Sequence, residues 1–284
     1  MVQIGLRAHD FGKTTPELLA ESLVSFRPAS IQLAFAKALV NPPQVPGGLS
    51  HGYANYIRSV FEKQNIRIAV LGCYINPVHP DADIRNRMLL SFEEHLRFAR
   101  DFNCPLVGTE TGSCNPDCSW HPDTEKPATF DLFCRSIERL LTAAEKCGSI
   151  VGVEAVAGQH TISSVELMEK LIEKMASPAL KVIYDPVNLI PETGLAESQE
   201  AFFSKAFSAF GKHITAIHSK DFRMEKGRKT GTFPTGTGQM DYKSFLKILL
   251  QQKPGIDILL ENSSPAAAAE SMRFLRETEA QVLL

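Results

Sequence analysis

Short apolar runs alternate with longer amphipathic stretches along the chain. The apolar runs are mostly continuous and β-branched, which is typical of parallel strands buried on both faces. They predict strands at residues 3–9, 30–35, 66–74, 106–112, 150–156, 181–186, 214–221 and 257–262, with a helix-like segment in every gap. Eight such units without a domain-sized break predict a single (β/α)₈ TIM barrel over residues 1–284 rather than an open doubly wound sheet.

Helix starts and loops can be read from the same pattern. Ser163, with Glu166 three residues later, predicts a capping box. Asp241 is expected to cap another helix, and Ser264 precedes a proline suited to a first helical position. Residues 41–48 and 114–127 are expected to form long strand-to-helix loops. Loops of that kind lie at the carboxyl end of a barrel, where active sites are built.

The composition of the chain limits which binding partners and which cellular compartment are expected. A net charge of −2 and a pI near 6.5 give no electrostatic reason to expect nucleic acid or an anionic membrane as partner. The amino-terminal segment lacks the pattern of a signal peptide, and the apolar runs are too short for a membrane span. The six scattered cysteines favour reduced thiols in a cytoplasm. The sequence leaves open whether the protein forms a homo-oligomer.

Four potential metal ligands fall at strand ends in the second half of the chain: Glu154, Asp185, His218 and Glu261. In each case an apolar run leads into the charged or imidazole side chain, and barrel closure would aim all of them at one mouth. Three buried carboxylates in one cavity would repel one another, and a divalent cation removes that cost. Mostly oxygen ligands favour Mn²⁺ or Mg²⁺, with Zn²⁺ or Co²⁺ as further options.

Several short motifs resemble the xylose-isomerase-like barrel superfamily of sugar phosphate isomerases and epimerases. They are Val151-Gly-Val-Glu154, Val182-Ile-Tyr-Asp185-Pro-Val-Asn188, Ile217-His218-Ser-Lys-Asp221, Pro234-Thr-Gly-Thr-Gly238 and Leu259-Leu-Glu261. The resemblance spans essentially the whole chain, and the order and spacing of the motifs are more specific than any one of them. It implies that Glu154, Asp185, His218 and Glu261 bind one divalent cation.

The resemblance also implies an activity, namely isomerisation or epimerisation of a sugar or sugar phosphate. The two ligand glutamates, Glu154 and Glu261, would act as acid and base. A cation chelated by a carbonyl and the adjacent hydroxyl lowers the pKa of the intervening C–H and stabilises a metal-bound enediolate. A glutamate that binds the cation through one oxygen keeps the other free to take the proton.

Further residues are expected to contact the carbohydrate substrate. Asn188 stands where many relatives have a substrate-contacting histidine, and Arg223 follows the His218 motif. Glu110 and His9 lie at the ends of other predicted strands. Lys220 and Asp221 are expected to pair with each other beside the site.

Three other functions stay open. A dehydratase like the inosose dehydratases shares the proton-abstraction step and differs only in the fate of the intermediate. An endonuclease IV-like phosphodiesterase would need additional histidine ligands, but Asn188 and Thr230-Gly-Thr232 occupy their positions. A noncatalytic sugar-binding barrel is the last alternative. The sequence does not specify the sugar or whether it is phosphorylated.

Overall fold

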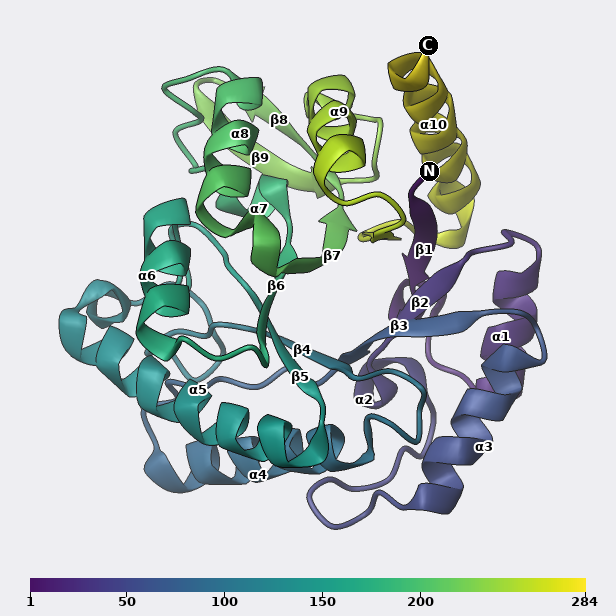
Figure 1. The fold of residues 1–284 in the computed structure, drawn as a ribbon, viewed down its shortest axis with the longest axis vertical. Helices are drawn as coiled ribbons and strands as arrows, with labels where there is room; N and C mark the ends of the chain where they lie inside the picture. Colours follow the sequence, from purple (N-terminus) through teal and green to yellow (C-terminus); the bar gives the residue numbers. More distant parts are fainter.

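Eight parallel strands close a barrel in the computed structural model, which describes residues 1–284 apart from the surroundings of Gly231 (Figure 1). The strand order around the barrel is β1-β10-β7-β6-β5-β4-β3-β2. The strands are β1 Gln3–Arg7, β2 Ser30–Leu33, β3 Arg67–Gly72, β4 Leu106–Glu110, β5 Ile150–Glu154, β6 Leu180–Tyr184, β7 Ile214–Ser219 and β10 Asp257–Leu260. The fold predicted from the apolar pattern, a (β/α)₈ barrel, is therefore confirmed.

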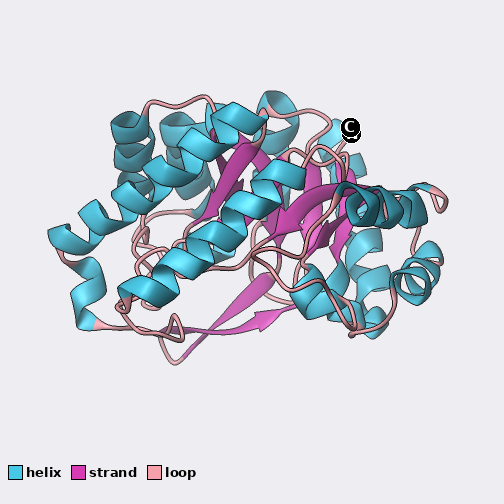
Figure 2. Cartoon of the chain, turned by 90° about the horizontal axis from the view of Figure 1, so that it is seen from below, coloured by secondary structure: helices cyan, strands magenta, loops and turns pink.

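Helices surround the barrel on its outside, as both ribbon views show (Figures 1 and 2). The longer ones are α1 Pro16–Val24, α3 His51–Glu62, α4 Ala82–Phe98, α5 Pro127–Cys147, α6 Val165–Met175, α8 Gln199–Phe210, α9 Tyr242–Gln252 and α10 Pro265–Leu283. Short helical turns lie in the connections: η1 Ala8–Phe11, α2 Phe35–Ala38, η2 Pro122–Glu125, α7 Pro186–Leu189 and η3 Gly211–His213. Within the described residues, every helix is too short or too polar to cross a membrane.

Asp241 and Ser264 stand at helix N-caps as predicted, although the Ser264 side chain makes no cap hydrogen bond, and a third predicted cap is shifted. Asp241 accepts a hydrogen bond from the Ser244 amide at 3.1 Å, as predicted for an N-cap. The cap of α6 is Ser164, whose hydroxyl accepts from the Leu167 amide at 3.2 Å, so the prediction of Ser163 was wrong by one residue. Two adjacent serines carry the same propensity, and the local pattern does not distinguish between them.

Close packing fills the barrel beneath its carboxyl end. A Cβ atom on Gly108 of β4 would lie 2.5 Å from Ile183 Cδ1, and one on Gly152 of β5 would lie 3.1 Å from the same atom. The absence of side chains at these two positions lets Ile183 of β6 fill the interior. A filled barrel is a rigid support for side chains at the strand ends.

A two-stranded hairpin extends beyond β7 and was not predicted. It consists of β8 Asp221–Glu225 and β9 Arg228–Phe233, and it lies apart from the barrel strands (Figure 2). Lys226 and Gly227 link the strands with φ angles of 51° and 77°, as in a type I′ turn. The strand predicted to run to residue 221 was therefore too long, because β7 ends at Ser219.

The carboxylate of Asp221 explains this early end. It accepts hydrogen bonds from the amides of Phe222 at 2.9 Å, Gly236 at 3.1 Å and Met240 at 2.9 Å. These bonds tie both ends of the hairpin to one buried side chain. The chain is thereby turned away from the barrel direction after residue 220.

Candidate metal centre

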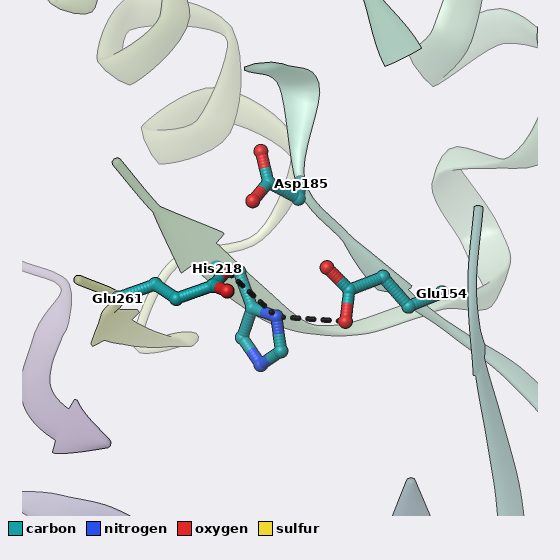
Figure 3. Close-up of side chains that lie close together, drawn as sticks. All are labelled: Glu154, Asp185, His218 and Glu261. Atoms are coloured by element: carbon teal, nitrogen blue, oxygen red, sulfur yellow. Dashed lines mark ion pairs between the residues drawn. The ribbon is translucent and has the colours of Figure 1, made fainter. Parts of the chain in front are cut away.

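Glu154, Asp185, His218 and Glu261 converge at the carboxyl end of the barrel (Figure 3). Glu154 ends β5, His218 lies in β7, and Asp185 and Glu261 directly follow β6 and β10. Each contributes one potential ligand atom, and these atoms all lie within 4.8 Å of one another. Parallel strands in a closed barrel place equivalent positions side by side, which is why the repeated strand-end pattern becomes a cluster.

Charge attraction links the members of this cluster. The Nδ1 atom of His218 lies 3.0 Å from Glu154 Oε2 and 3.6 Å from Glu261 Oε2. Glu154 and Glu261 approach His218 from opposite sides (Figure 3). His218 Nδ1 and Asp185 Oδ2 are nevertheless buried without a well-formed hydrogen bond among the described residues. Buried polar atoms of this kind usually have a partner, and three carboxylates with one imidazole are suitable ligands for a divalent cation.

Gln32 of β2 and, through it, Tyr74 set the orientation of His218. Its Nε2 atom is hydrogen-bonded to the amide oxygen of Gln32 in β2, and the Gln32 amide nitrogen donates to the Tyr74 hydroxyl at 2.5 Å. An amide oxygen only accepts, so Nε2 must donate, and in the neutral ring the lone pair is on Nδ1, toward the cluster. Sequence reasoning missed both partners, because a glutamine within a strand can face either the barrel interior or the helices.

Two cations balance the carboxylates. Arg7, at the end of β1, pairs with Glu261 Oε1 and donates to Asn262 Oδ1 at 2.8 Å. The ammonium of Lys220 lies 3.0 Å from Asp185 Oδ2 and 3.2 Å from Glu261 Oε2. The prediction that Lys220 pairs with Asp221 was therefore wrong, because Lys220 faces the cluster while Asp221 binds backbone amides of the hairpin.

Burial and neighbouring charge shift the protonation of the cluster. Burial raises the pKa of Asp185 to about 6, against the opposing effect of Lys220. Burial disfavours protonated His218, but the carboxylates of Glu154 and Glu261 outweigh it and raise its pKa to about 8. Burial would also raise the pKa of Glu261, yet Lys220, His218 and Arg7 together hold it well below its usual range. Glu261 is thus a persistently ionised carboxylate.

Asn188 and Glu110 lie beside Glu154. The Asn188 side-chain amide donates to Glu154 Oε1 at 2.7 Å, and its backbone amide donates to Asp185 Oδ1 at 3.0 Å. Glu110 ends β4 in register with Glu154, and its Oε2 atom lies 3.8 Å from His160 Nε2. Burial and the charge of Glu261 raise the pKa of Glu110. Asn188 contacts a catalytic candidate directly, whereas its assignment to substrate binding stays a prediction.

The other two expected substrate contacts differ in position. His9 lies in η1 at the barrel mouth, with its ring edge against Tyr74 at a centroid distance of 6.2 Å, and burial lowers its pKa to about 3. Arg223 lies on the hairpin, with its guanidinium 4.4 Å from the Phe233 ring centroid and bonded to the Thr237 carbonyl at 2.8 Å. The structure brings His9 near the cluster and places Arg223 on the exposed hairpin. Both substrate roles stay predictions.

Solved structures with the same fold include sugar epimerases and metal-bound proteins. D-Psicose 3-epimerase from Clostridium cellulolyticum H10, solved with D-tagatose, superposes with a TM-score of 0.72 at 13% identity, covering 98% of this chain and 99% of that one. A xylose isomerase-like barrel from Mycobacterium smegmatis, in complex with magnesium, gives 0.75 at 15% identity over 100% and 98% of the two chains. The IOLI protein with a bound zinc atom gives 0.72 at 14% identity over 99% and 98%.

Sequence comparison supports the same relationship at the level of the family. No curated protein matches the chain significantly in sequence. The family model for the xylose isomerase-like TIM barrel, in contrast, matches residues 30–278 and so includes all members of the four-ligand cluster. The chain therefore belongs to the xylose isomerase-like TIM barrel family.

Proposed function

We propose that the protein is a divalent-metal-dependent isomerase or epimerase that moves a proton at a carbon next to the carbonyl of a sugar or sugar phosphate. The observation that carries this proposal is the pair of carboxylates, Glu154 and Glu261, on opposite sides of a buried cluster in which two ligand atoms lack a well-formed hydrogen bond among the described residues. The epimerase among the structural neighbours supports it.

The four clustered side chains would hold the cation. Their oxygen-rich composition suits Mn²⁺ or Mg²⁺, with Zn²⁺ or Co²⁺ as alternatives, and structural neighbours contain magnesium or zinc. When bound, such a cation polarises the substrate carbonyl and stabilises negative charge on its oxygen. Gln32 directs the Nδ1 lone pair of His218 toward this position.

Glu261 would act as one of the two proton-transfer groups. Arg7 and Lys220 fix its orientation from two directions. Glu154 faces it across the cluster, with one oxygen held by the Asn188 amide. A proton removed by one glutamate and returned by the other on the opposite face inverts a carbon centre, whereas a proton returned to the neighbouring carbon isomerises the sugar.

Lys220 and Arg7 also add positive charge where negative charge develops on substrate oxygens during proton removal. Both are anchored by ion pairs, so they require little rearrangement during the reaction. Asn188 keeps Glu154 in one orientation. These three residues position the reacting groups.

Endonuclease IV-like chemistry is less consistent with this geometry. That reaction uses more than one metal, and the position that would supply an additional imidazole is Asn188. Its amide is already engaged with Glu154. We therefore favour carbohydrate proton transfer over phosphodiester cleavage.

Deuterium incorporation tests the proposal. The metal-loaded protein is incubated in D₂O and Mn²⁺ with a panel of ketoses and inososes, and carbon-bound deuterium is followed by NMR. We expect exchange at one carbon adjacent to the carbonyl, and its loss in protein stripped with a chelator. Retained metal without exchange on any substrate would favour a noncatalytic sugar-binding barrel. Exchange accompanied by loss of water from the substrate would instead identify a dehydratase.

A further inference from the structure

A side cavity of about 260 Å³ lies between the segments that follow β2 and β3 and helix α4. Its walls are mostly apolar and include Phe35, Val45, Ile75 and Met88. A cavity of roughly 150 Å³ with apolar walls already holds benzene, so this one has room for a substituted ring. It opens at the same end of the barrel as the candidate metal centre.

One buried histidine in the cavity wall has a ring nitrogen without a hydrogen-bond partner among the described residues. His95 of α4 is 5% exposed and stacks on Phe35 with ring centroids 4.8 Å apart and an interplanar angle of 10°. Its Nδ1 atom is bonded to the Ser91 carbonyl at 2.7 Å. A carbonyl only accepts, so Nδ1 carries the proton and Nε2 has the lone pair. Burial lowers the pKa of His95, which keeps the ring neutral and Nε2 an acceptor.

Tyr74 forms a wall shared by the cavity and the metal centre. Its ring lines the cavity, while its hydroxyl accepts from Gln32, which holds His218. The ammonium of Lys37, which also lines the cavity, lies 3.7 Å from the Tyr74 ring centroid and close enough to Glu110 and Glu261 for their charges to act on its pKa. A substrate with its sugar at the metal centre could therefore extend a substituent past Tyr74 and Lys37 into the cavity.

The loop over the cavity is held in place by a buried carboxylate. Glu94 accepts hydrogen bonds from the backbone amides of Gly47 and, at 2.7 Å, Leu49. Ser91 donates its hydroxyl to the Val45 carbonyl at 3.0 Å. Residues 41–48 are thus fixed to α4 around the open space. Pre-organisation of this kind lowers the entropic cost of binding a ligand.

We propose that this cavity binds an aromatic, hydroxyl-bearing substituent of the substrate, so that the protein acts on a phenolic derivative of a sugar. The apolar walls accept the ring, and Nε2 of His95 accepts the hydroxyl proton. The sugar half of this assignment rests on the proposed function. Binding of the ring does not, because it requires neither the cation nor Glu154 and Glu261.

Phenol and anisole are matched probes, since both contain the ring and only phenol donates a hydrogen bond. We would titrate each probe into metal-free protein whose methionine methyl groups carry ¹³C, and follow the NMR signal of Met88 in the cavity wall. The variant Met88→Leu identifies that signal among those of the 7 methionines. Phenol should shift the Met88 signal saturably and bind about 2- to 10-fold more tightly than anisole, the usual range for one hydrogen bond. His95→Phe should remove that preference, whereas His51→Phe on the exposed surface should retain it.

Two variants at Ser91 test the location. Ser91→Leu fills the cavity and should abolish phenol binding, whereas Ser91→Ala removes the same hydroxyl and leaves the space open. Thermal unfolding of each variant verifies that it is folded. The proposal is overturned if phenol leaves the Met88 signal unchanged, binds no better than anisole, or still binds Ser91→Leu. Phenol binding without deuterium exchange on any sugar would refute the proposed function and leave the subsite intact.

Discussion

The two halves of the barrel contribute different chemistry to the same mouth. Strands β5, β6, β7 and β10 end in the potential ligands Glu154, Asp185, His218 and Glu261. Arg7 at the end of β1 and Gln32 in β2 contact those ligands, and Tyr74, just after β3, contacts Gln32. The second half therefore supplies the potential ligands together with the ammonium of Lys220. The first half supplies Arg7, which neutralises Glu261, and Gln32, which accepts from His218 and orients it.

This difference has a physical reason. Carboxylates that share a buried site repel one another, and each needs a donor to fix its orientation. Arg7 satisfies one oxygen of Glu261, and Gln32 satisfies the ring nitrogen of His218 that faces away from the cluster. The first half also contains the side cavity beside Tyr74.

The largest expected effect is the loss of metal binding when two ligands of the second half are removed. Glu154→Gln combined with Asp185→Asn should reduce affinity for Mn²⁺ by more than about 100-fold, because changes to outer partners alone cost about 10- to 100-fold. Calorimetry and elemental analysis measure the change. The matched control is Asp131→Asn with Glu166→Gln, two exposed carboxylates on outer helices. Unchanged affinity in the first double variant would exclude the site.

The second prediction concerns His160, which follows β5 and faces Glu110 of β4 across the boundary between the halves. Burial lowers its pKa to about 4, below its value of about 6.5 in the unfolded chain. The unfolded state therefore takes up the proton first as pH falls, and stability present above pH 6.5 is lost toward pH 4. The loss attributable to this residue should reach about 3 kcal/mol.

Denaturant unfolding of the wild type and His160→Gln between pH 7 and pH 4 measures that loss. The free energy of unfolding of the variant should depend less steeply on pH in this window. An identical pH dependence in both proteins would show that His160 is protonated in the folded state as readily as in the unfolded one.

The third prediction tests whether the first half orients the second. Gln32→Leu removes the partner of His218 Nε2 and should weaken Mn²⁺ binding by about 10- to 100-fold without changing any ligand. Tyr74→Phe removes only the hydroxyl that contacts Gln32 and should have a smaller effect. Calorimetry on both variants makes the comparison. Wild-type affinity in Gln32→Leu would mean that β7 alone orients His218.

The smallest effect is expected at Arg223, outside both halves. Its guanidinium is exposed on the hairpin and bonded to the Thr237 carbonyl. Arg223→Ala should leave metal affinity unchanged and change kcat/KM by less than about 10-fold, since an exposed side chain contributes little binding energy. Steady-state kinetics with the substrate found in the exchange panel measures this. A larger loss would place Arg223 in the substrate site.

The sequence predicted the second half of the site better than the first. Glu154 and Glu261 are recognisable because each ends an apolar run, and a strand end in a barrel has a known direction. Gln32 gives no such signal, since a polar residue within a strand can face either the interior or the helices. Lys220 and Asp221 were paired because they are adjacent, but neighbouring residues on an extended chain face opposite ways. The hairpin was missed because β9 is largely polar, unlike the barrel strands.

The most direct test of the account is solvent proton exchange in wild type, Glu154→Gln and Glu261→Gln, with metal content measured in each. Each glutamate variant that retains the cation should exchange the carbon-bound substrate proton about 10²- to 10⁴-fold more slowly than wild type, the usual effect of removing a general acid or base. A metal-loaded variant that exchanges at the wild-type rate would contradict the account. That glutamate would then be only a ligand, and proton transfer would have to be assigned to another residue such as Glu110.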